Sequence, residues 1–190
     1  MKFETPLYAG KIIKRYKRFL ADIELEGGET ITAHTSNTGS MKTCWAPGWP
    51  VMVSYHDSPK RKLKYSLEMT HNGETWIGVN TSLPNRLAKE AVESGLIPEL
   101  QGYDSVRPEK KIGQSRIDLY LSSKETGQEC YVEVKNVTLL GHHRAALFPD
   151  AISTRGQKHL KELIELKKQG VRAAMLYIVQ RQDVDHFRPA

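Results

Sequence analysis

The sequence predicts two regions of different class, a small all-β region followed by a mixed α/β region. Short runs rich in β-branched and aromatic residues, separated by Gly, Pro, Asn and Ser, fill residues 1–81. From residue 82 onward, segments with a helical spacing of apolar residues alternate with strand-like runs. We therefore expect one domain over residues 1–81 and a second over 82–190, each with its own small core.

Five runs of strand character are expected in the first region, at residues 11–25, 30–34, 51–55, 64–69 and 75–79. Glu26-Gly-Gly-Glu29 separates the first run from its return strand. Asn72-Gly73 between the last two runs is a strong hairpin signal. Short strands at this spacing predict a small barrel or sandwich.

The second region is expected to begin with a helix that Asn85 caps and Gly95 stops. Strands follow at residues 115–122 and 130–139. A second helix is expected from Ser153/Thr154 to a stop at Gly170, with an apolar face of Leu160, Leu163 and Ile164. Residues 171–179 are almost wholly apolar, which predicts a buried strand.

The charge balance indicates a nucleic-acid partner. Lys and Arg number 28 against 22 Asp and Glu, a net charge of +6 with a pI near 9.2. Two basic clusters, each beside a tyrosine, supply candidate DNA-binding residues: Lys14, Arg15, Lys17 and Arg18, then Lys60, Arg61, Lys62 and Lys64. Cations follow a phosphate backbone and aromatic rings stack on bases, although a solvated loop explains either cluster alone equally well.

Several classes of protein are disfavoured. No apolar run approaches the roughly 18 residues of a membrane helix, and no secretory signal follows Met1. Cys44 and Cys130 make neither a disulfide framework nor a zinc pattern. We expect a cytoplasmic protein with no membrane partner.

Alternation in residues 115–121 and 130–135 sets Asp118 on one strand and Glu133 and Lys135 on the next. A hairpin centred between Glu125 and Thr126 pairs residues whose numbers sum to 251, so that Asp118 lies opposite Glu133. Carboxylates facing each other repel unless a cation neutralises them, and Mg²⁺ or Mn²⁺ has the preference for oxygen ligands that fits. Metal-assisted phosphodiester hydrolysis is the chemistry that this group supports. A half-exposed hairpin without function has the same alternation, and the spacing alone favours that interpretation.

Six collinear blocks resemble the sugar fermentation stimulation protein A family, at residues 14–22, 34–41, 80–87, 115–118, 133–139 and 148–160. The most specific is Arg155-Gly-Gln-Lys-His159. The resemblance implies an N-terminal OB-type barrel and a C-terminal PD-(D/E)xK nuclease-like domain, shortened at its C-terminal end. It also implies a DNA-binding protein of bacteria and archaea.

By this resemblance Asp118 is the motif aspartate, and Glu133 and Lys135 are the (D/E)xK pair. Gln157, with Arg155 nearby, matches a polar helix residue facing the site. Glu90 is a candidate for an additional acidic residue, in competition with Glu93 and Glu109. Two functions remain open: a magnesium-dependent DNA nuclease, or a non-catalytic DNA-binding regulator of sugar (maltose) metabolism that keeps the scaffold. Domains of this kind often act as homodimers.

Overall fold

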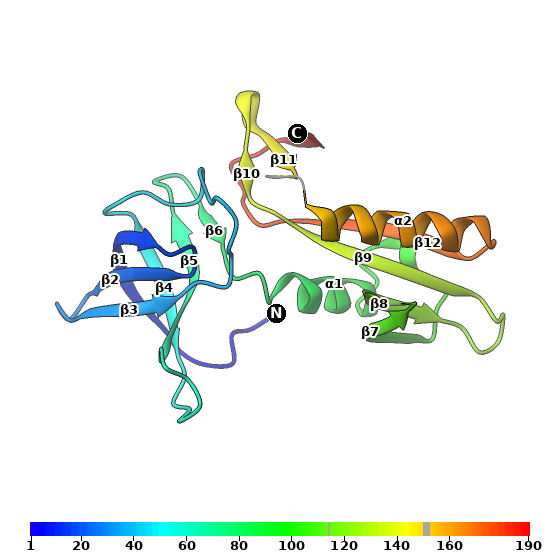
Figure 1. Ribbon diagram of the computed structural model, residues 1–190, viewed down its shortest axis with the longest axis horizontal. Helices are drawn as coiled ribbons and strands as arrows, with labels where there is room; N and C mark the ends of the chain where they lie inside the picture. Colours follow the sequence, from blue (N-terminus) through cyan, green and yellow to red (C-terminus); the bar gives the residue numbers. More distant parts are fainter. Residues whose placement is uncertain (114, 150–152) are drawn as a thin grey trace. The chain divides into compact units, whose positions relative to one another are not determined.

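The strands of the first 81 residues close into a barrel in the computed structural model, which describes residues 1–113, 115–149 and 153–190 (Figure 1). These strands are β1 (Leu7–Tyr16), β2 (Leu20–Leu25), β3 (Thr30–His34), β4 (Pro50–Tyr55), β5 (Tyr65–His71) and β6 (Trp76–Gly78). Their order is β3-β2-β1-β4-β5-β6, and an additional β3–β5 pairing closes five of them into the barrel. The predicted small barrel is confirmed.

The barrel interior is filled by branched aliphatic side chains from alternate strand positions. Ile12, Ile23, Val51 and Val53 are fully buried there. Neighbours such as Ile13 on β1 face outward, as the two-residue period of a strand requires. The Asn72-Gly73 hairpin is confirmed between β5 and β6, with Gly73 at a φ of 95°.

The first predicted run, residues 11–25, is wrong as a single strand because it contains a turn. β1 ends at Tyr16 and β2 begins at Leu20, and these two residues pair. Lys17 and Arg18 make the turn with φ angles of 48° and 66°. Neither is Gly, Asn or Asp, the residues that ordinarily reveal such a turn.

The second region contains a four-stranded sheet with helices on both faces. Its elements are α1 (Pro84–Glu93), the 3₁₀ turn η1 (Pro98–Leu100), β7 (Ser105–Ile112), β8 (Ser115–Ser122), β9 (Glu129–Val137), α2 (Thr154–Lys168) and β12 (Arg172–Val179). The strand order is β12-β9-β8-β7. Leu119 packs with α1, whereas Tyr120 packs with α2, so successive residues of β8 face opposite helices. Among the described residues, no helix is long and apolar enough to cross a bilayer.

Two strands of this sheet differ from the prediction. β7 was not expected because Pro108 and a series of charges interrupt it, and its position at the sheet edge tolerates both. β12 was expected to be buried but forms the opposite edge, where its apolar residues are only half-buried. Strict alternation along β8 would place Ile117 on the same face as Leu119, yet Ile117 joins the Tyr120 cluster. The β8–β9 ladder begins at Leu119, and Ile117 lies outside the part of β8 that this ladder holds in regular alternation.

Helix α2 begins where the sequence predicts. The Ser153 side chain accepts a hydrogen bond from the Gly156 N–H at 3.0 Å, which caps the helix. The predicted apolar face is partly wrong, because Leu160 and Ile164 are 47% and 45% exposed. The buried stripe instead runs through His159, Leu163 and Leu166, so a histidine occupies a position against the sheet.

Later segments of the chain pack with the barrel. β10 (Leu139–Leu140), β11 (Ala145–Phe148) and β13 (His186–Pro189) form a small sheet in the order β10-β11-β13, with the 3₁₀ turn η2 (His142–Arg144) between the first two. These strands belong to the same compact unit as Lys2–Thr81, which we call the barrel unit. The other compact unit, with α1, α2 and the four-stranded sheet, is called the α/β unit.

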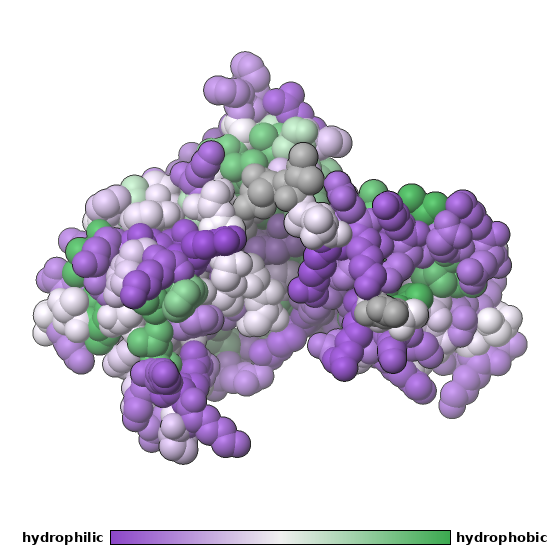
Figure 2. Space-filling view, viewed as in Figure 1, coloured by the Kyte–Doolittle hydropathy of each residue, from purple (hydrophilic) through white to green (hydrophobic). Residues whose placement is uncertain are grey.

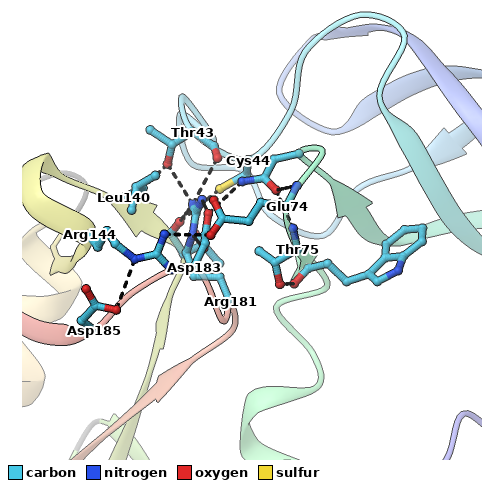
Figure 3. A network of polar contacts seen from close by, with 12 residues as sticks. Thr43, Cys44, Glu74, Thr75, Leu140, Arg144, Arg181, Asp183 and Asp185 are labelled. Atoms are coloured by element: carbon cyan, nitrogen blue, oxygen red, sulfur yellow. Dashed lines mark hydrogen bonds and ion pairs between the residues drawn. The ribbon is translucent and has the colours of Figure 1, made fainter.

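A buried ion pair fastens the last of these segments within the barrel unit (Figure 3). The Arg181 guanidinium donates to both carboxylate oxygens of Asp183 at 2.6 Å, and both side chains are almost fully buried. Arg181 Nη1 also donates to the carbonyl oxygens of Thr43 and Thr138 at 3.1 and 2.8 Å. Asn72 Nδ2 donates to Asp183 at 2.8 Å. Every charge in this cluster is therefore matched by a partner.

Candidate catalytic site and nucleic-acid surface

Asp118 lies where the β8–β9 ladder ends. The predicted register is confirmed over Leu119–Ser122, where Tyr120 pairs with Tyr131 and all pairs sum to 251. The predicted pair of Asp118 with Glu133 is not part of this ladder. The Asp118 side chain instead binds the β9 backbone, because the Val134 N–H donates to Asp118 Oδ2 at 2.8 Å. The β9 backbone thus orients the carboxylate.

Asn85 holds the other oxygen of this carboxylate. Its Nδ2 donates to Asp118 Oδ1 at 2.8 Å. The prediction that Asn85 caps α1 is wrong, because Leu83 occupies the N-cap and no side chain caps the helix there. Pro84 at the start of α1 has no N–H to satisfy, which reduces the need for a cap and leaves Asn85 available to Asp118.

Glu133 is 2% exposed and faces α2. Its Oε1 accepts from Lys135 Nζ at 2.5 Å and is also in hydrogen-bond contact with His159 Nδ1. Its Oε2 is buried and has no hydrogen-bond partner among the described residues. One oxygen of this buried carboxylate is therefore doubly bound and the other is left without a donor.

Burial and a neighbouring negative charge dominate the electrostatics of Asp118. Burial raises the pKa of Asp118, and the negative charge of Glu133 raises it further. The Val134 N–H, Asn85 and Lys135 oppose this pKa shift without cancelling it. The surroundings of Asp118 therefore favour its protonated form more than water does.

A divalent cation fits this arrangement. In the described ranges no group of three or more His, Cys, Asp and Glu side chains is arranged to hold a metal. Two carboxylates are nevertheless enough for Mg²⁺, which keeps several waters and takes one or two protein carboxylates. The unpartnered Glu133 Oε2 is the ligand atom that such an ion would satisfy.

The other predicted site residues lie outside these contacts. Gln157 and Arg155 are exposed on the first turns of α2. The residue of α2 that reaches Glu133 is His159. Glu90 is exposed and binds the Met1 amino group at 2.7 Å. Its two competitors bind surface cations, Glu93 to Lys89 and Glu109 to Arg116.

Sequence reasoning missed two residues of the site, Asn85 and His159. Both lie within blocks that carry the family resemblance, at residues 80–87 and 148–160. Their place inside these blocks was the one signal in the sequence that could have identified them as site residues. Asn85 was interpreted as a helix cap because of its residue type, and the predicted apolar face of the second helix did not include His159.

Two residues of the first basic cluster, Arg15 and Arg18, form hydrogen bonds within the barrel unit. Arg15 Nη2 donates to the carbonyl oxygens of Asn37 and Gly39 at 2.8 and 3.0 Å, and burial lowers its pKa. Arg18 Nε donates to Thr38 O at 2.8 Å. These two arginines hold the loop after β3. Lys14 binds Asp22 at 3.3 Å, and Lys17 is exposed on the turn.

The second basic cluster lies in the loop between β4 and β5. Figure 2 shows this loop as a strongly hydrophilic projection at the bottom of the view. Lys60 and Lys62 are exposed there. Arg61 donates to Ser66 Oγ at 2.6 Å, and Lys64 binds Asp57 at 2.8 Å.

Three tyrosines gather at the base of this loop. Tyr65 packs edge-on against Tyr55 and Tyr8, with ring centroids 5.2 and 6.3 Å apart. Lys64 Nζ lies 5.8 Å from the Tyr55 ring centroid, and Tyr8 is 44% exposed. Tyr8 is therefore the exposed ring of this group, and Tyr55 is the half-buried ring beside a cation.

Comparison with known proteins decides the family. A family model described as the sugar fermentation stimulation protein RE domain matches residues 82–190, and one described as the SfsA N-terminal OB domain matches residues 13–79. The chain belongs to the sugar fermentation stimulation protein family. The resemblance of the six sequence blocks is thereby confirmed, and the barrel is an OB domain.

Individual relatives agree with this assignment. Sugar fermentation stimulation protein homologs from Geotalea uraniireducens and Geobacter metallireducens are 54% and 52% identical over 191 and 192 residues. These alignments cover all of this chain and 81% and 82% of the relatives. The structure of Pyrococcus furiosus SfsA in complex with Ca²⁺ is similar with a TM-score of 0.85 at 28% identity, covering 100% of this chain and 79% of that one.

Proposed function

We propose that this protein binds DNA and hydrolyses phosphodiester bonds with the help of a divalent cation held by Asp118 and Glu133. The observation that carries the proposal is the buried, unpartnered Oε2 of Glu133 beside a second carboxylate whose pKa is raised. Leaving such a group unmatched costs stability, so a cation ligand is a better explanation than a structural role.

The order Asp118, Glu133, Lys135 supports assignment of the α/β unit to the PD-(D/E)xK nuclease-like class. Ca²⁺ in the Pyrococcus furiosus relative is an ion that takes oxygen ligands, and this is consistent with a carboxylate site here. When bound, Mg²⁺ or Mn²⁺ would polarise a phosphoryl oxygen and acidify a water.

The residues of the chain supply binding and orientation. Asn85 and the Val134 N–H hold the two oxygens of Asp118 in a fixed direction. Lys135 remains beside Glu133, where its ammonium can offset the charge that develops on a phosphate under attack. Exposed Lys17, Lys60 and Lys62 and the tyrosines of the barrel unit supply contacts to a nucleic-acid strand.

The alternative function is DNA binding without catalysis, as in a regulator of sugar metabolism. Two observations favour it: Lys135 is already paired with Glu133, and no third carboxylate joins the described site. Incubation of plasmid and single-stranded DNA with Mg²⁺, Mn²⁺ or EDTA separates the two functions.

On the catalytic proposal the wild type cleaves with metal and not with EDTA, and Asp118→Asn does not cleave. Glu93→Gln, which removes the same charge from an exposed ion pair, should cleave like the wild type. Absence of cleavage in every metal, with DNA binding intact, would favour the regulator.

A further inference from the structure

We infer that His159 is a positioning residue, which fixes one oxygen of Glu133 so that the other is presented to the cation. The inference rests on the proposed metal site and extends it to a residue of α2. His159 is 6% exposed and lies in the buried stripe of this helix, with its Nδ1 against Glu133 Oε1.

The partners of Glu133 Oε1 determine which atom of this contact donates. Lys135 Nζ carries only donors and also binds Oε1, so Oε1 is an acceptor. The His159 contact to the same oxygen therefore has Nδ1–H as its donor. A carboxylate oxygen with two donors is a poor metal ligand, because its lone pairs are already engaged.

The two oxygens of Glu133 thus have different roles. Oε1 is held from α2 by His159 and from its own strand by Lys135, whereas Oε2 is buried with no donor in the described residues. Rotation of the carboxylate would exchange these roles, and His159 opposes that rotation from the neighbouring helix. Partners of this kind, which orient a ligand without touching the metal, typically contribute 10–100-fold to metal affinity.

An alternative explanation of the contact is packing alone, in which His159 fills space between α2 and the sheet. Leu163 provides the matched control, since it is 5% exposed on the same buried stripe and belongs to an apolar cluster with Tyr120 and Tyr131. A packing role predicts that variants of both residues lower stability and leave metal affinity unchanged.

The test is calorimetric titration of the full chain with Ca²⁺ alone, together with thermal unfolding without metal. His159→Leu removes the donor, and we expect Ca²⁺ affinity to fall by about 10–100-fold. His159→Asn places an amide N–H close to the Nδ1 position, and affinity should recover to within a few-fold of wild type. Leu163→Ala should lower the melting temperature and keep wild-type affinity.

Other outcomes would contradict the role of His159, the role of its Nδ1 donor or the metal site itself. Wild-type affinity in both His159 variants would assign His159 to packing and leave the metal site intact. Equal losses in His159→Leu and His159→Asn would show that the donor at Nδ1 does not matter. Failure of the wild type to bind Ca²⁺, Mg²⁺ or Mn²⁺ would overturn the metal site itself, and the positioning role with it.

Discussion

The two compact units treat buried charge in opposite ways. In the barrel unit, the hydrogen bonds from Arg181 lower the pKa of Asp183, and Asn72 lowers it further. In the α/β unit, burial and Glu133 raise the pKa of Asp118, and Glu133 Oε2 has no donor in the described residues. A cluster whose charges are all matched requires no ligand to be stable. A buried carboxylate oxygen without a donor is instead a group that a bound ligand can satisfy.

Removing Arg181 should have the largest effect, which is a loss in the free energy of unfolding of the barrel unit. Arg181→Met leaves Asp183 buried with only Asn72 as a side-chain donor, and the loss of one partner of a buried pair costs about 3–5 kcal/mol. Urea unfolding measures the loss. Arg144→Met is the control, because Arg144 pairs with Glu74 and Asp185 at the surface and should change the free energy of unfolding by no more than about 1 kcal/mol. Equal losses in the two variants would contradict the structural role given to Arg181.

Removing Lys135 should act on chemistry rather than on folding. Lys135→Met keeps most of the stem volume and removes the ammonium beside Glu133. Single-turnover cleavage should fall by about 100-fold, as expected for loss of a well-placed electrostatic group. Equilibrium DNA binding should change only slightly. Lys111→Met, on an exposed position of β7, is the control and should cleave like the wild type. A large loss of DNA affinity with unchanged cleavage would assign Lys135 to binding.

Variants of exposed cations should change the salt dependence of DNA binding, whereas a variant of a cation with a structural role should change stability. Lys17, Lys60 and Lys62 are exposed, and changing all three to Gln should flatten the log–log salt slope by up to about 3 units. Arg15→Gln should instead lower stability, because Arg15 holds the carbonyls of Asn37 and Gly39. Fluorescence anisotropy with labelled DNA over a salt series measures the slope. An unchanged slope in the triple variant would place the DNA contact elsewhere.

The smallest expected effect is the pH dependence that Asp183 supplies. Its pKa is lower in the folded protein than in the unfolded chain, so the stability that it contributes is present above the unfolded pKa of about 3.9. That contribution is lost as the pH falls through the folded pKa. Asp183→Asn should therefore unfold with a weaker pH dependence below pH 4 in thermal scans from pH 2 to 7. Acid unfolding identical to wild type would show that Asp183 is not ionised in the folded barrel unit.

The sequence alone predicted most of the barrel strands and the Tyr120–Tyr131 register, because strand alternation and the Asn72-Gly73 turn are local signals. β7 and the turn at Lys17-Arg18 were missed, since charges at an edge strand and a turn without Gly leave no local signature. Asp118, Glu133 and Lys135 were named together from alternation and resemblance. In the structure Lys135 binds Glu133, whereas Asp118 accepts from the Val134 N–H and Asn85. Asn85 and His159 were missed because helix-to-sheet contacts depend on how the helices pack.

The Arg181 cluster has a consequence for synthesis on the ribosome. Thr43 and Arg181 are separated by 138 positions in the chain, although they share a buried hydrogen bond. At a synthesis rate of about 5–20 residues per second, roughly 7–28 s pass between the two residues. For that interval the nascent barrel lacks the guanidinium that donates to the Thr43 carbonyl in the finished protein. The first strands to emerge therefore wait for Arg181 before the buried ion pair of this unit can form, and chaperones and proteases have that interval to act.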